Sequence, residues 1–572
     1  MTEKLQRLEL TWPGKEDRFN PEPRILLEDK KKSYSRSAEQ TDLLDSAVKP
    51  TFDNMLIHGD NLLALKALEQ DYSGKIKCIY IDPPYNTGNA FEHYDDGLEH
   101  SIWLSLMRDR LEILKRLLAE DGSIFIQIND DEYPYLKIIC DEVFGRNNYE
   151  ATFYVKVRHE NRILREDTRY QLVIEQVLFY KKSNLFIPPR REKTKDISLD
   201  YIWDIEIIGK PTSIERIHGY DVEIYKPTDY KITKSENGSF KQYQIRGSLI
   251  TQKGSASEYY EQNLRTRREL DGLGTLYKVI GMGINGDGLG YRYIIQPSKS
   301  DSKNGFYFQG KPKKSTVNKG LPYPNFYDCV NIFNNAGYEG GNEFRGGKKP
   351  EDWICFLLSL VTNPGDLVLD SFLGSGTTAA VAQKMGRRWI GVEMGDHVYT
   401  HCIPRLKKVI DGEDQGGITK AVNWQGGGGF KFYELASSLI VTDKYGQQII
   451  SKEYNADMLA EAMCKILGYR YKPDKEIYWK QGFSSEKNFI YTTTMSLQES
   501  SLDRLAEEIG DNNLLICCSA FVGNSRIYPN ISVKKIPAAI LKKCEWGREG
   551  YPLNLRNYHP TDEEFEFEEE EE

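Results

Sequence analysis

The stretch Leu367-Val-Leu-Asp-Ser-Phe-Leu-Gly-Ser-Gly-Thr-Thr-Ala-Ala-Val-Ala-Gln-Lys-Met385 decides the fold class. Its apolar start predicts a buried strand, its two glycines predict a tight turn, and residues 377–385 predict a helix. Glycines at a strand–helix junction let the backbone approach a ligand closely, because they carry no Cβ. The apolar stretch 388–392 predicts a second strand, which ends at Glu393. This order is typical of α/β domains that bind nucleotides.

The spacing of two acids around the glycine turn indicates a nucleoside. Glu393 follows Asp370 by 23 residues. An acid about 20 residues after such a turn is placed to accept hydrogen bonds from the hydroxyls of a ribose. The turn lacks the lysine of a phosphate-binding loop, which argues against an NTPase. Glycine turns of this kind also occur where nothing binds, so the turn alone leaves a purely structural role open.

Strand and helix patterns also alternate near the beginning of the chain. Apolar spacing predicts strands and helices in the order 55–58, 62–68, 75–81, 102–118 and 123–128. This alternation is typical of a doubly wound α/β domain. It lapses in a region rich in Tyr, Lys, Gly and Asn, and then returns with the glycine turn. The sequence therefore predicts one α/β domain that is split around a large insert.

These patterns divide the chain into six predicted segments. The predicted segments are a loosely structured arm (1–50), the first part of the α/β domain (51–160), an insert (161–340), the second part of the α/β domain (341–430), a C-terminal α/β domain (436–556) and an acidic tail (557–572). Gly426–Gly429 is the predicted linker before the C-terminal domain.

The charge of the chain is unevenly distributed. The net charge is −9, but residues 562–572 carry nine acids and no base, so the rest of the chain is neutral. Residues 151–350 carry 33 Lys and Arg against 23 Asp and Glu. Such an excess indicates a nucleic-acid surface on the insert, although it is also compatible with ordinary solvated surface. The acidic tail is expected to be disordered, and it could compete with DNA for the basic surface.

The remaining composition indicates a cytoplasmic protein. The first residues are charged and lack the apolar stretch of a signal peptide, and no apolar run approaches the ~20 residues that span a bilayer. The nine cysteines include no CxxC pair, which argues against both a disulfide framework and a zinc site. We therefore expect a reducing cytoplasm, no membrane and no metal.

A second motif, Asp82-Pro-Pro-Tyr85, follows the strand predicted over 75–81. The prolines fix their own φ angles and restrict Asp82 before them. A carboxylate, the rigid Pro83 carbonyl and an aromatic ring are thereby held at a strand end, where ligands of α/β domains bind. Asp82 and the Pro83 carbonyl would accept two hydrogens of a base amino group, and Tyr85 would stack on the base, which must flip out of its duplex. The alternative is a surface turn that binds nothing.

Together the two motifs resemble those of the amino-methyltransferases of DNA in their β arrangement. Ile81-Asp-Pro-Pro-Tyr-Asn-Thr-Gly88 precedes Phe372-x-Gly-x-Gly-Thr-Thr378, with a basic insert between them, as in that family. Trp103–Leu111 and Gly122–Ile126 also resemble the modification (Mod) subunits of type III restriction–modification systems. The resemblance covers residues 51–430, and it extends less specifically to Val533–Pro537 and Cys544–Trp546.

The resemblance implies a Rossmann-like, circularly permuted domain that binds S-adenosyl-L-methionine, with a target-recognition insert. Glu393 would hold the ribose, Lys349-Pro350 would lie along the methionine end, and Asp60 would lie near the cofactor adenine. The cofactor-binding residues it implies are Asp60, Asp82, Lys349, Pro350, Asp370, Phe372, Gly374, Gly376, Thr377 and Glu393. The catalytic residues it implies are Asp82, Pro83, Pro84 and Tyr85.

The implied reaction is methyl transfer to adenine N6 in double-stranded DNA by a modification subunit. An Asp in the first position of the Asp-Pro-Pro-Tyr motif favours adenine over cytosine N4. Two further classes of protein stay open, a DNA-recognition subunit for a partner nuclease and a protein or RNA methyltransferase. A homodimer and a separate helicase/nuclease restriction subunit are compatible partners. Glu175…Phe179-Tyr180 is expected either in an aromatic wall of the base pocket or in an ordinary buried strand.

Overall fold

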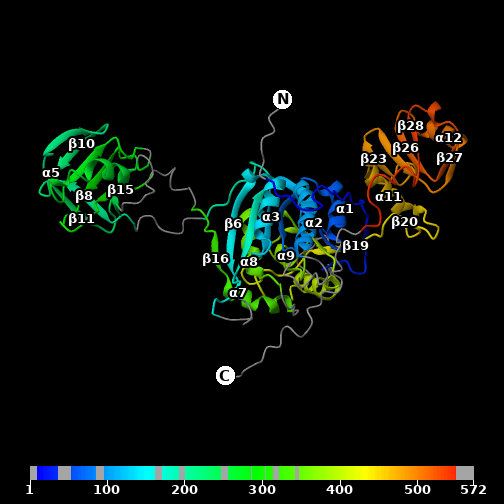
Figure 1. The fold of residues 1–572 in the computed structure, drawn as a ribbon, viewed down its shortest axis with the longest axis horizontal. Helices are drawn as coiled ribbons and strands as arrows, with labels where there is room; N and C mark the ends of the chain where they lie inside the picture. Colours follow the sequence, from blue (N-terminus) through cyan, green and yellow to red (C-terminus); the bar gives the residue numbers. More distant parts are fainter. Residues whose placement is uncertain are drawn as a thin grey trace, which may run out of the picture. The chain divides into compact units, whose positions relative to one another are not determined.

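The computed structural model separates the chain into two compact units, 1–188 with 324–572, and 189–323 (Figure 1). It describes residues 9–36, 53–85, 96–161, 170–191, 200–245, 255–284, 286–302, 304–312, 321–341 and 347–548. The predicted acidic tail and Asn86–Gly88 of the Asp-Pro-Pro-Tyr stretch lie outside these residues.

The first unit is built on an eleven-stranded sheet, with strands in the order β1-β19-β3-β18-β17-β4-β5-β7-β6-β16, where β6 spans Tyr149–Lys156, and with β2 paired with β19. Its centre consists of five parallel strands: β3 (Asn54–His58), β18 (Arg388–Glu393), β17 (Leu367–Asp370), β4 (Ile76–Ile81) and β5 (Leu118–Ile128). Each contains a buried, mainly apolar run, as is usual where both faces of a parallel sheet are covered. The α/β class that the sequence predicts is therefore observed.

The sheet order brings the two motifs together although they lie far apart in the sequence. β17, which leads into the glycine turn, lies between β18 and β4, and Leu369 is in register with Ile79 of β4. Because the three strands are parallel, their carboxyl ends meet at one edge. Asp82 and the glycine turn therefore emerge side by side.

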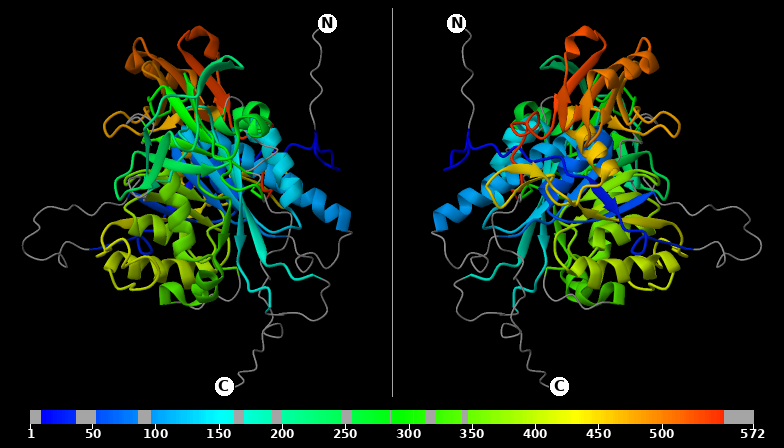
Figure 2. Two further views of the ribbon diagram at one scale, coloured as in Figure 1. Left: turned by 90° about the vertical axis from the view of Figure 1, so that its left-hand side faces the viewer. Right: turned by 90° about the vertical axis from the view of Figure 1, so that its right-hand side faces the viewer.

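Helices cover both faces of the sheet (Figure 2). One core packs α1 (Asn61–Tyr72) and α2 (Asp96–Leu117) on the strands, and a second core packs α8 (Glu351–Val361), α9 (Thr377–Lys384) and α10 (Ile403–Asp411). The predicted amphipathic helix at 102–118 is α2, whose Trp103, Leu111 and Leu114 are buried. These helices position the loops at the carboxyl edge of the sheet.

The N-terminal segment corrects one prediction, because its described part is not a loose arm. β1 (Leu26–Glu28) and β2 (Tyr34–Ser35) both pair with β19 (Gly429–Leu435) at the sheet edge. These pairings satisfy the backbone groups that an edge strand would otherwise expose. The strands are too short to show a periodic apolar pattern, which is why the sequence did not indicate them. The rest of residues 1–50 lies outside the described part of the chain.

Two predicted boundaries also need correction. β19 continues the large sheet to Leu435, and the predicted linker is packed: the Gly427 amide donates to the Ile410 carbonyl at 2.7 Å, and Gln383 Nε2 donates to the Gly427 carbonyl at 2.9 Å. The predicted insert 161–340 is too wide, since it includes two strands of the large sheet. These strands, which flank the compact unit 189–323, are β7 (Ile174–Lys181) and β16 (Phe326–Asp328).

The second unit, 189–323, contains an eight-stranded antiparallel sheet in the order β11-β8-β12-β15-β14-β13-β10-β9. Apart from β14, its strands are β8 (Trp203–Ile207), β9 (Ser213–Ile217), β10 (Tyr220–Tyr225), β11 (Tyr230–Lys234), β12 (Phe240–Gln244), β13 (Leu276–Ile280) and β15 (Phe306–Gly310). Aromatic and β-branched side chains fill it on both faces, which gives two small cores. β14 spans Tyr291–Ile295, as its apolar spacing predicts. The unit carries 23 Lys and Arg against 16 Asp and Glu, so it is net basic.

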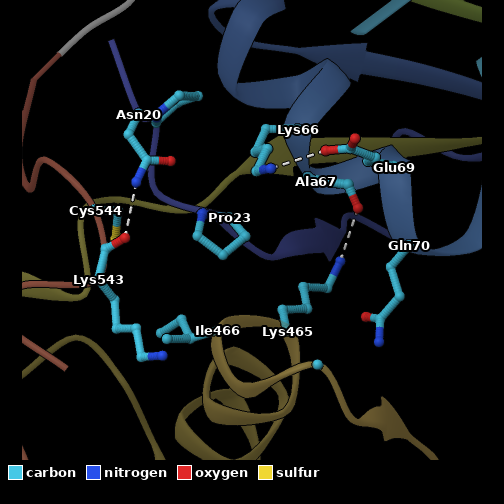
Figure 3. Close-up of a pocket in the computed structure, with 12 residues that line it drawn as sticks. Asn20, Pro23, Lys66, Ala67, Glu69, Gln70, Lys465, Ile466, Lys543 and Cys544 are labelled. Atoms are coloured by element: carbon cyan, nitrogen blue, oxygen red, sulfur yellow. Dashed lines mark hydrogen bonds and ion pairs between the residues drawn. The ribbon is translucent and has the colours of Figure 1, made fainter. Parts of the chain in front are cut away.

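The C-terminal part of the first unit contains a further, smaller sheet with its own helices. This mixed sheet has the order β22-β23-β24-β26-β28, with α11 (Ala456–Leu467) and α12 (Glu499–Ile509). Its strands are β22 (Arg470–Tyr471), β23 (Gly482–Ser485), β24 (Asn488–Thr492), β26 (Asn513–Cys518) and β28 (Ile531–Lys535). A cavity of 320 Å³ lies where α1, α11 and residues 20–23 meet (Figure 3). There Lys465 Nζ donates to the Ala67 carbonyl at 3.1 Å, and Asn20 Nδ2 donates to the Lys543 carbonyl at 2.9 Å. Among the described residues, no helix has both the length and the apolar character needed to cross a membrane.

Candidate active site

Asp82 lies at the end of β4 with one carboxylate oxygen engaged and the other open. Its Oδ2 forms an ion pair with Lys349 Nζ at 2.7 Å. Its Oδ1 is buried and has no hydrogen-bond partner among the described residues. Burial raises the pKa of Asp82, and the nearby charge of Glu175 adds to this effect, whereas the ammonium of Lys349 opposes it. The open oxygen is a buried acceptor for which the described residues supply no donor.

Tyr85 is anchored by its hydroxyl to a carboxylate on a neighbouring strand. Its Oη donates to Glu175 Oε2 at 2.9 Å, and the ammonium of Lys349 lies 5.0 Å from the centre of its ring. Burial raises the pKa of Tyr85 well above its usual value, and the charges of Asp82 and Glu175 raise it further. The phenol therefore stays neutral and keeps its proton for this hydrogen bond.

The two prolines between these residues form a rigid connection that is braced by α2. Pro83 is buried and Pro84 is exposed, and the Pro84 carbonyl accepts a hydrogen bond from Trp103 Nε1 at 2.9 Å. Trp103 is itself buried in the α2 core. This contact with α2 thereby helps to fix the spacing between the Asp82 carboxylate and the Tyr85 ring.

The glycine turn after β17 requires glycine at two positions. Gly374 and Gly376 have φ values of 56° and 81°, and Gly376 is the N-cap of α9. Only glycine adopts this left-handed region without steric cost. Asp370 Oδ1 accepts the Phe372 amide at 2.9 Å, which holds the turn onto the strand end.

Glu393, at the end of β18, fastens the glycine turn to the next strand. Its Oε2 accepts the Gly374 amide at 2.7 Å, and its Oε1 accepts the amides of Met394 and Gly395, each at 2.8 Å. His397 Nε2 lies 3.1 Å from Oε1. Burial raises the pKa of Glu393, but the contact with His397 and the backbone donors outweigh it, so that the pKa is lowered. The acid is ionised at neutral pH, and Oε2 has capacity for a further donor.

Asp60, after β3, caps α1 and faces a buried arginine. Its Oδ1 accepts the Leu63 amide at 3.0 Å, and its Oδ2 lies 3.7 Å from Arg110 Nη2. The neighbouring Asn61 donates through Nδ2 to the Ser371 carbonyl at 2.8 Å. This bond ties the start of α1 to the residue that follows Asp370.

Lys349 and Thr377 lie differently from what a simple cofactor-lining role suggests. Lys349 points at Asp82, Glu175 and the Tyr85 ring, while Pro350 is the N-cap of α8. The Thr377 hydroxyl is buried beneath the turn, where its Oγ1 accepts Arg405 Nη1 at 2.8 Å.

The structure thus gathers the predicted residues at one edge of the sheet, the carboxyl ends of β3, β18, β17 and β4. Of the stretch Glu175…Tyr180, only Glu175 contacts them. Phe179 and Tyr180 are buried in the cores, which agrees with the buried-strand interpretation of these two residues. Nothing in the sequence indicated Gln127 and Trp353, because no motif surrounds them. Gln127 donates a hydrogen bond to Glu175, and Trp353 donates one to Gln127. The described residues contain no group of three His, Cys, Asp or Glu side chains placed to hold a metal ion.

Asp370 gives this edge a pH dependence that can be measured. Burial raises its pKa to about 7. An acid whose pKa is raised in the folded state contributes its full stabilisation below its pKa in the unfolded chain, which is near 4. This stabilisation is lost as the pH rises through 7. Without ligands, the free energy of unfolding of wild type should therefore fall between pH 5 and pH 8 by on the order of 2–4 kcal/mol relative to that of Asp370→Asn. Urea unfolding at both pH values measures this, and a pH-independent difference would contradict it.

Comparison with known proteins agrees with this geometry. A family model described as DNA methylase matches residues 76–403. The probable type III restriction–modification enzyme HindVI Mod subunit of Haemophilus influenzae is 35% identical over 73% of this chain and 58% of its own length. The EcoPI Mod subunit of Escherichia phage P1 is 27% identical over 57% of this chain and 54% of its own. The chain therefore spans little more than half of these two relatives.

A type II methyltransferase and solved structures are also similar. M.EcaI of Enterobacter cloacae is 27% identical over 68% of this chain and 75% of its own length. A putative DNA modification methylase of Thermus thermophilus, complexed with S-adenosyl-L-methionine, matches 67% of this chain and 98% of its own at 14% identity and a TM-score of 0.31. The cytosine-N4-specific PvuII DNA methyltransferase matches 66% and 94% at 16% identity and a TM-score of 0.30.

Proposed function

We propose, since the chain belongs to the DNA methylase family, that it transfers a methyl group from S-adenosyl-L-methionine to adenine N6 in double-stranded DNA. The observation that carries this proposal is the open, buried Oδ1 of Asp82, held beside a stacking tyrosine and next to the glycine turn. An amino group that donates to Oδ1 would lie at the edge of the sheet where the glycine turn would hold a nucleoside.

The residues of the chain would act mainly by positioning and by charge. An exocyclic amine is a poor nucleophile, because its lone pair is delocalised into the ring. When S-adenosylmethionine is bound, it supplies a methyl group on a sulfonium as the electrophile. The bond from the amine nitrogen to the methyl carbon would form as the carbon–sulfur bond breaks, the product sulfide would leave, and the methylated amine would release one proton to solvent. A hydrogen bond from the amine to Asp82 Oδ1 favours a tetrahedral nitrogen, which frees the lone pair. Tyr85 orients the base plane, and this alignment supplies much of the remaining rate enhancement.

Transfer of tritium from labelled cofactor to unmethylated genomic DNA tests the function. We expect labelled DNA with wild type and labelling that is about 10²–10³-fold slower with Asp82→Ala. Absence of label with folded wild-type protein would favour a recognition subunit for a partner nuclease. Label that appears only in added RNA or protein would favour the other methyltransferase classes.

The choice of adenine rests on Asp82 as the first residue of the Asp-Pro-Pro-Tyr motif, a feature of the adenine enzymes that this chain resembles. Cytosine N4 is the second candidate, since its amine suits the same acceptor. Sequencing of modified bases in DNA from cells that express the protein separates the two and also gives the target sequence.

The cofactor residues yield a quantitative prediction. Glu393→Ala should weaken S-adenosylmethionine binding by about 1.5–3 kcal/mol, the typical worth of hydrogen bonds to a charged group. Because Glu393 also holds the Gly374 amide, calorimetry should compare the cofactor with its 2′-deoxy analogue. Wild type should discriminate between the two ligands, and the variant should not. Unchanged cofactor affinity in Glu393→Ala would remove this residue from the site.

The order of elements supports a circularly permuted Rossmann-like domain with an inserted recognition unit. β17 lies at the centre of the sheet but comes late in the chain, and the unit 189–323 lies between the two motif-bearing parts in sequence. Replacing residues 189–323 with those of a relative should change the methylated sequence and keep the transfer chemistry. Modified-base sequencing reads this out. An unchanged target would place recognition elsewhere, for example in the C-terminal domain.

The biological setting follows from the named relatives. The similarity to two type III Mod subunits supports a cytoplasmic modification subunit with a separate restriction partner. A homodimer stays a prediction. Co-expression with a candidate helicase/nuclease subunit, followed by size-exclusion chromatography, tests for the partner.

A further inference from the structure

Glu175 gathers three hydrogen donors around the candidate base pocket. Tyr85 Oη and Gln127 Nε2 both donate to its Oε2, at 2.9 and 2.6 Å, and Lys349 Nζ lies 3.7 Å from the same oxygen. Its side chain is only 13% exposed. Glu175 lies on β7, which runs antiparallel to β5. It comes one residue before Gln176, which pairs with Ile128 at the end of β5. Glu175 therefore approaches the site from β7, whereas Asp82 and the rest of the Asp-Pro-Pro-Tyr motif follow β4.

The position of Glu175 is defined by a buried chain of hydrogen bonds. Gln127 Oε1 accepts Tyr80 Oη at 2.8 Å and Trp353 Nε1 at 3.1 Å. Because both partners are donors, the Gln127 amide must present its nitrogen to Glu175. Gln127, Tyr80 and Trp353 are all buried. The carboxylate is thus held by the core of the α/β domain and is not free to follow Tyr85.

The ammonium of Lys349 lies between the carboxylates of Asp82 and Glu175. The ammonium lies 2.7 Å from Asp82 Oδ2 and 3.7 Å from Glu175 Oε2, and it faces the Tyr85 ring at 5.0 Å. With Lys349 held in this place, Asp82 keeps Oδ2 engaged and Oδ1 open. One carboxylate thereby fixes both the stacking ring and the cation that orients the acceptor.

We propose that Glu175 is a positioning residue of the base pocket, which fixes the Tyr85 ring by its hydroxyl and holds Lys349 against Asp82. This inference rests on the proposed methyl transfer. Glu175 acts through other side chains and need not touch the base. Its role predicts that the effects of losing Glu175 and of losing the Tyr85 hydroxyl overlap, because both remove the same restraint.

A double-mutant cycle on methyl transfer to unmethylated genomic DNA tests this. Tyr85→Phe keeps the ring and removes only the hydroxyl. Tyr85→Phe and Glu175→Leu should each lower kcat/KM by about 10- to 100-fold, since small misplacements of reacting groups have effects of this size. The double variant should be little worse than the poorer single variant. Cofactor affinity measured by calorimetry without DNA should change less than threefold.

Asp141 offers a matched control on the other side of β7. It accepts Tyr180 Oη at 2.7 Å and pairs with Lys137 at 2.8 Å, so that, like Glu175, it is a partly buried carboxylate with a tyrosine and a lysine partner. Asp141→Leu should lower the melting temperature by a similar amount and leave kcat/KM unchanged. An equal loss of kcat/KM in Asp141→Leu would show that Glu175 acts only through stability and would overturn the proposal.

Glu175→Gln adds a readout that a purely structural role would not change. The amide oxygen can still accept from Tyr85, but the negative charge that raises the pKa of Asp82 is gone. The charged and titratable groups that face Asp82 are Lys349, Glu175, Tyr85, Tyr80 and Asp370. The acid limb of the pH profile of kcat/KM should therefore move to lower pH in Glu175→Gln.

The outcomes separate this inference from the proposed function. If wild type transfers no methyl group to DNA, the proposed function fails. If wild type is active but the effects of Glu175→Leu and Tyr85→Phe multiply, or the acid limb stays in place in Glu175→Gln, the positioning role of Glu175 is wrong and the proposed function stands.

Discussion

Asp82→Asn is expected to lower turnover by about 10²–10³-fold, the size of effect seen when one preorganised transition-state contact is lost. The structure explains why an amide cannot replace the acid. The oxygen of the new amide would turn to the ammonium of Lys349, which holds Asp82 Oδ2 at 2.7 Å. Its NH2 group would then occupy the position of Oδ1 and meet the target amine donor to donor. Single-turnover kinetics with labelled cofactor measures the loss.

Cofactor and DNA binding should be retained in this variant, because Asp82 is needed chiefly as the amine becomes tetrahedral. Calorimetry and 2-aminopurine fluorescence at the target position report the two binding steps separately. Asp82→Ala should behave similarly in turnover but lose more stability, since Lys349 is left with Glu175 at 3.7 Å. Turnover near the wild-type rate in Asp82→Asn would show that the Asp-Pro-Pro-Tyr motif is only a rigid turn.

Tyr85→Ala provides the contrast within the same pocket. Stacking on an aromatic ring is worth about 1–3 kcal/mol per base, so the flipped state should be less populated. Its defect should shrink when the target adenine lies opposite a mismatch, because a mismatched base costs less to extrude. The defect of Asp82→Asn should not shrink in this way, because it arises after flipping.

The sequence predicts those parts of the site that depend on local backbone chemistry. The glycine turn and the Asp-Pro-Pro-Tyr motif are recognisable because φ is restricted by residue type, and both lie at strand ends as expected. That they are neighbours follows from the sheet order, which only the resemblance implied. The pairing of Lys349 with Asp82 joins residues 267 positions apart and leaves no periodic signal.

The errors of prediction have a common physical cause. Residues 9–36 and β7 were misjudged because their place depends on partners that are distant in sequence, the edge strand β19 and the strand β5. Two- and three-residue strands carry almost no propensity signal of their own. Glu175 belonged to a stretch expected either in an aromatic wall or in a buried strand. Phe179 and Tyr180 are buried in the cores, whereas Glu175 faces the site, which neither expectation included.

A buried ion network beneath the glycine turn was equally invisible in the sequence. Glu351, Lys384, Arg405 and Asp414 are all buried, and the distances are 2.7 Å for Lys384–Glu351, 2.9 Å for Lys384–Asp414 and 2.8 Å for Arg405–Glu351. Arg405 Nη1 also donates to the Ser375 carbonyl at 3.3 Å. The network thus joins the start of α8, next to Lys349, to the turn before α9.

Arg405→Met is expected to destabilise the protein by about 3–5 kcal/mol, because removing one of the two cations leaves the buried network of Glu351, Lys384 and Asp414 with one uncompensated negative charge. Urea unfolding measures the loss. Arg18→Met is the matched control, since Arg18 pairs with Glu112 at 2.6 Å but both side chains are exposed. Its cost should stay within about 1 kcal/mol, as is usual for surface ion pairs.

The double variant Arg405→Met/Glu351→Met decides between lost charge balance and lost packing. It removes one positive and one negative charge, so Lys384 and Asp414 remain as a neutral pair at 2.9 Å. If uncompensated charge causes the loss, the double variant should be more stable than Arg405→Met, as buried ion pairs exchanged for apolar residues often are. Cofactor affinity should be lower than in wild type in both Arg405→Met and the double variant, because Ser375 and Thr377 lack the guanidinium that holds the turn. Recovery of cofactor affinity together with stability would show that the turn needs only an undamaged core, and that Arg405 does not hold it.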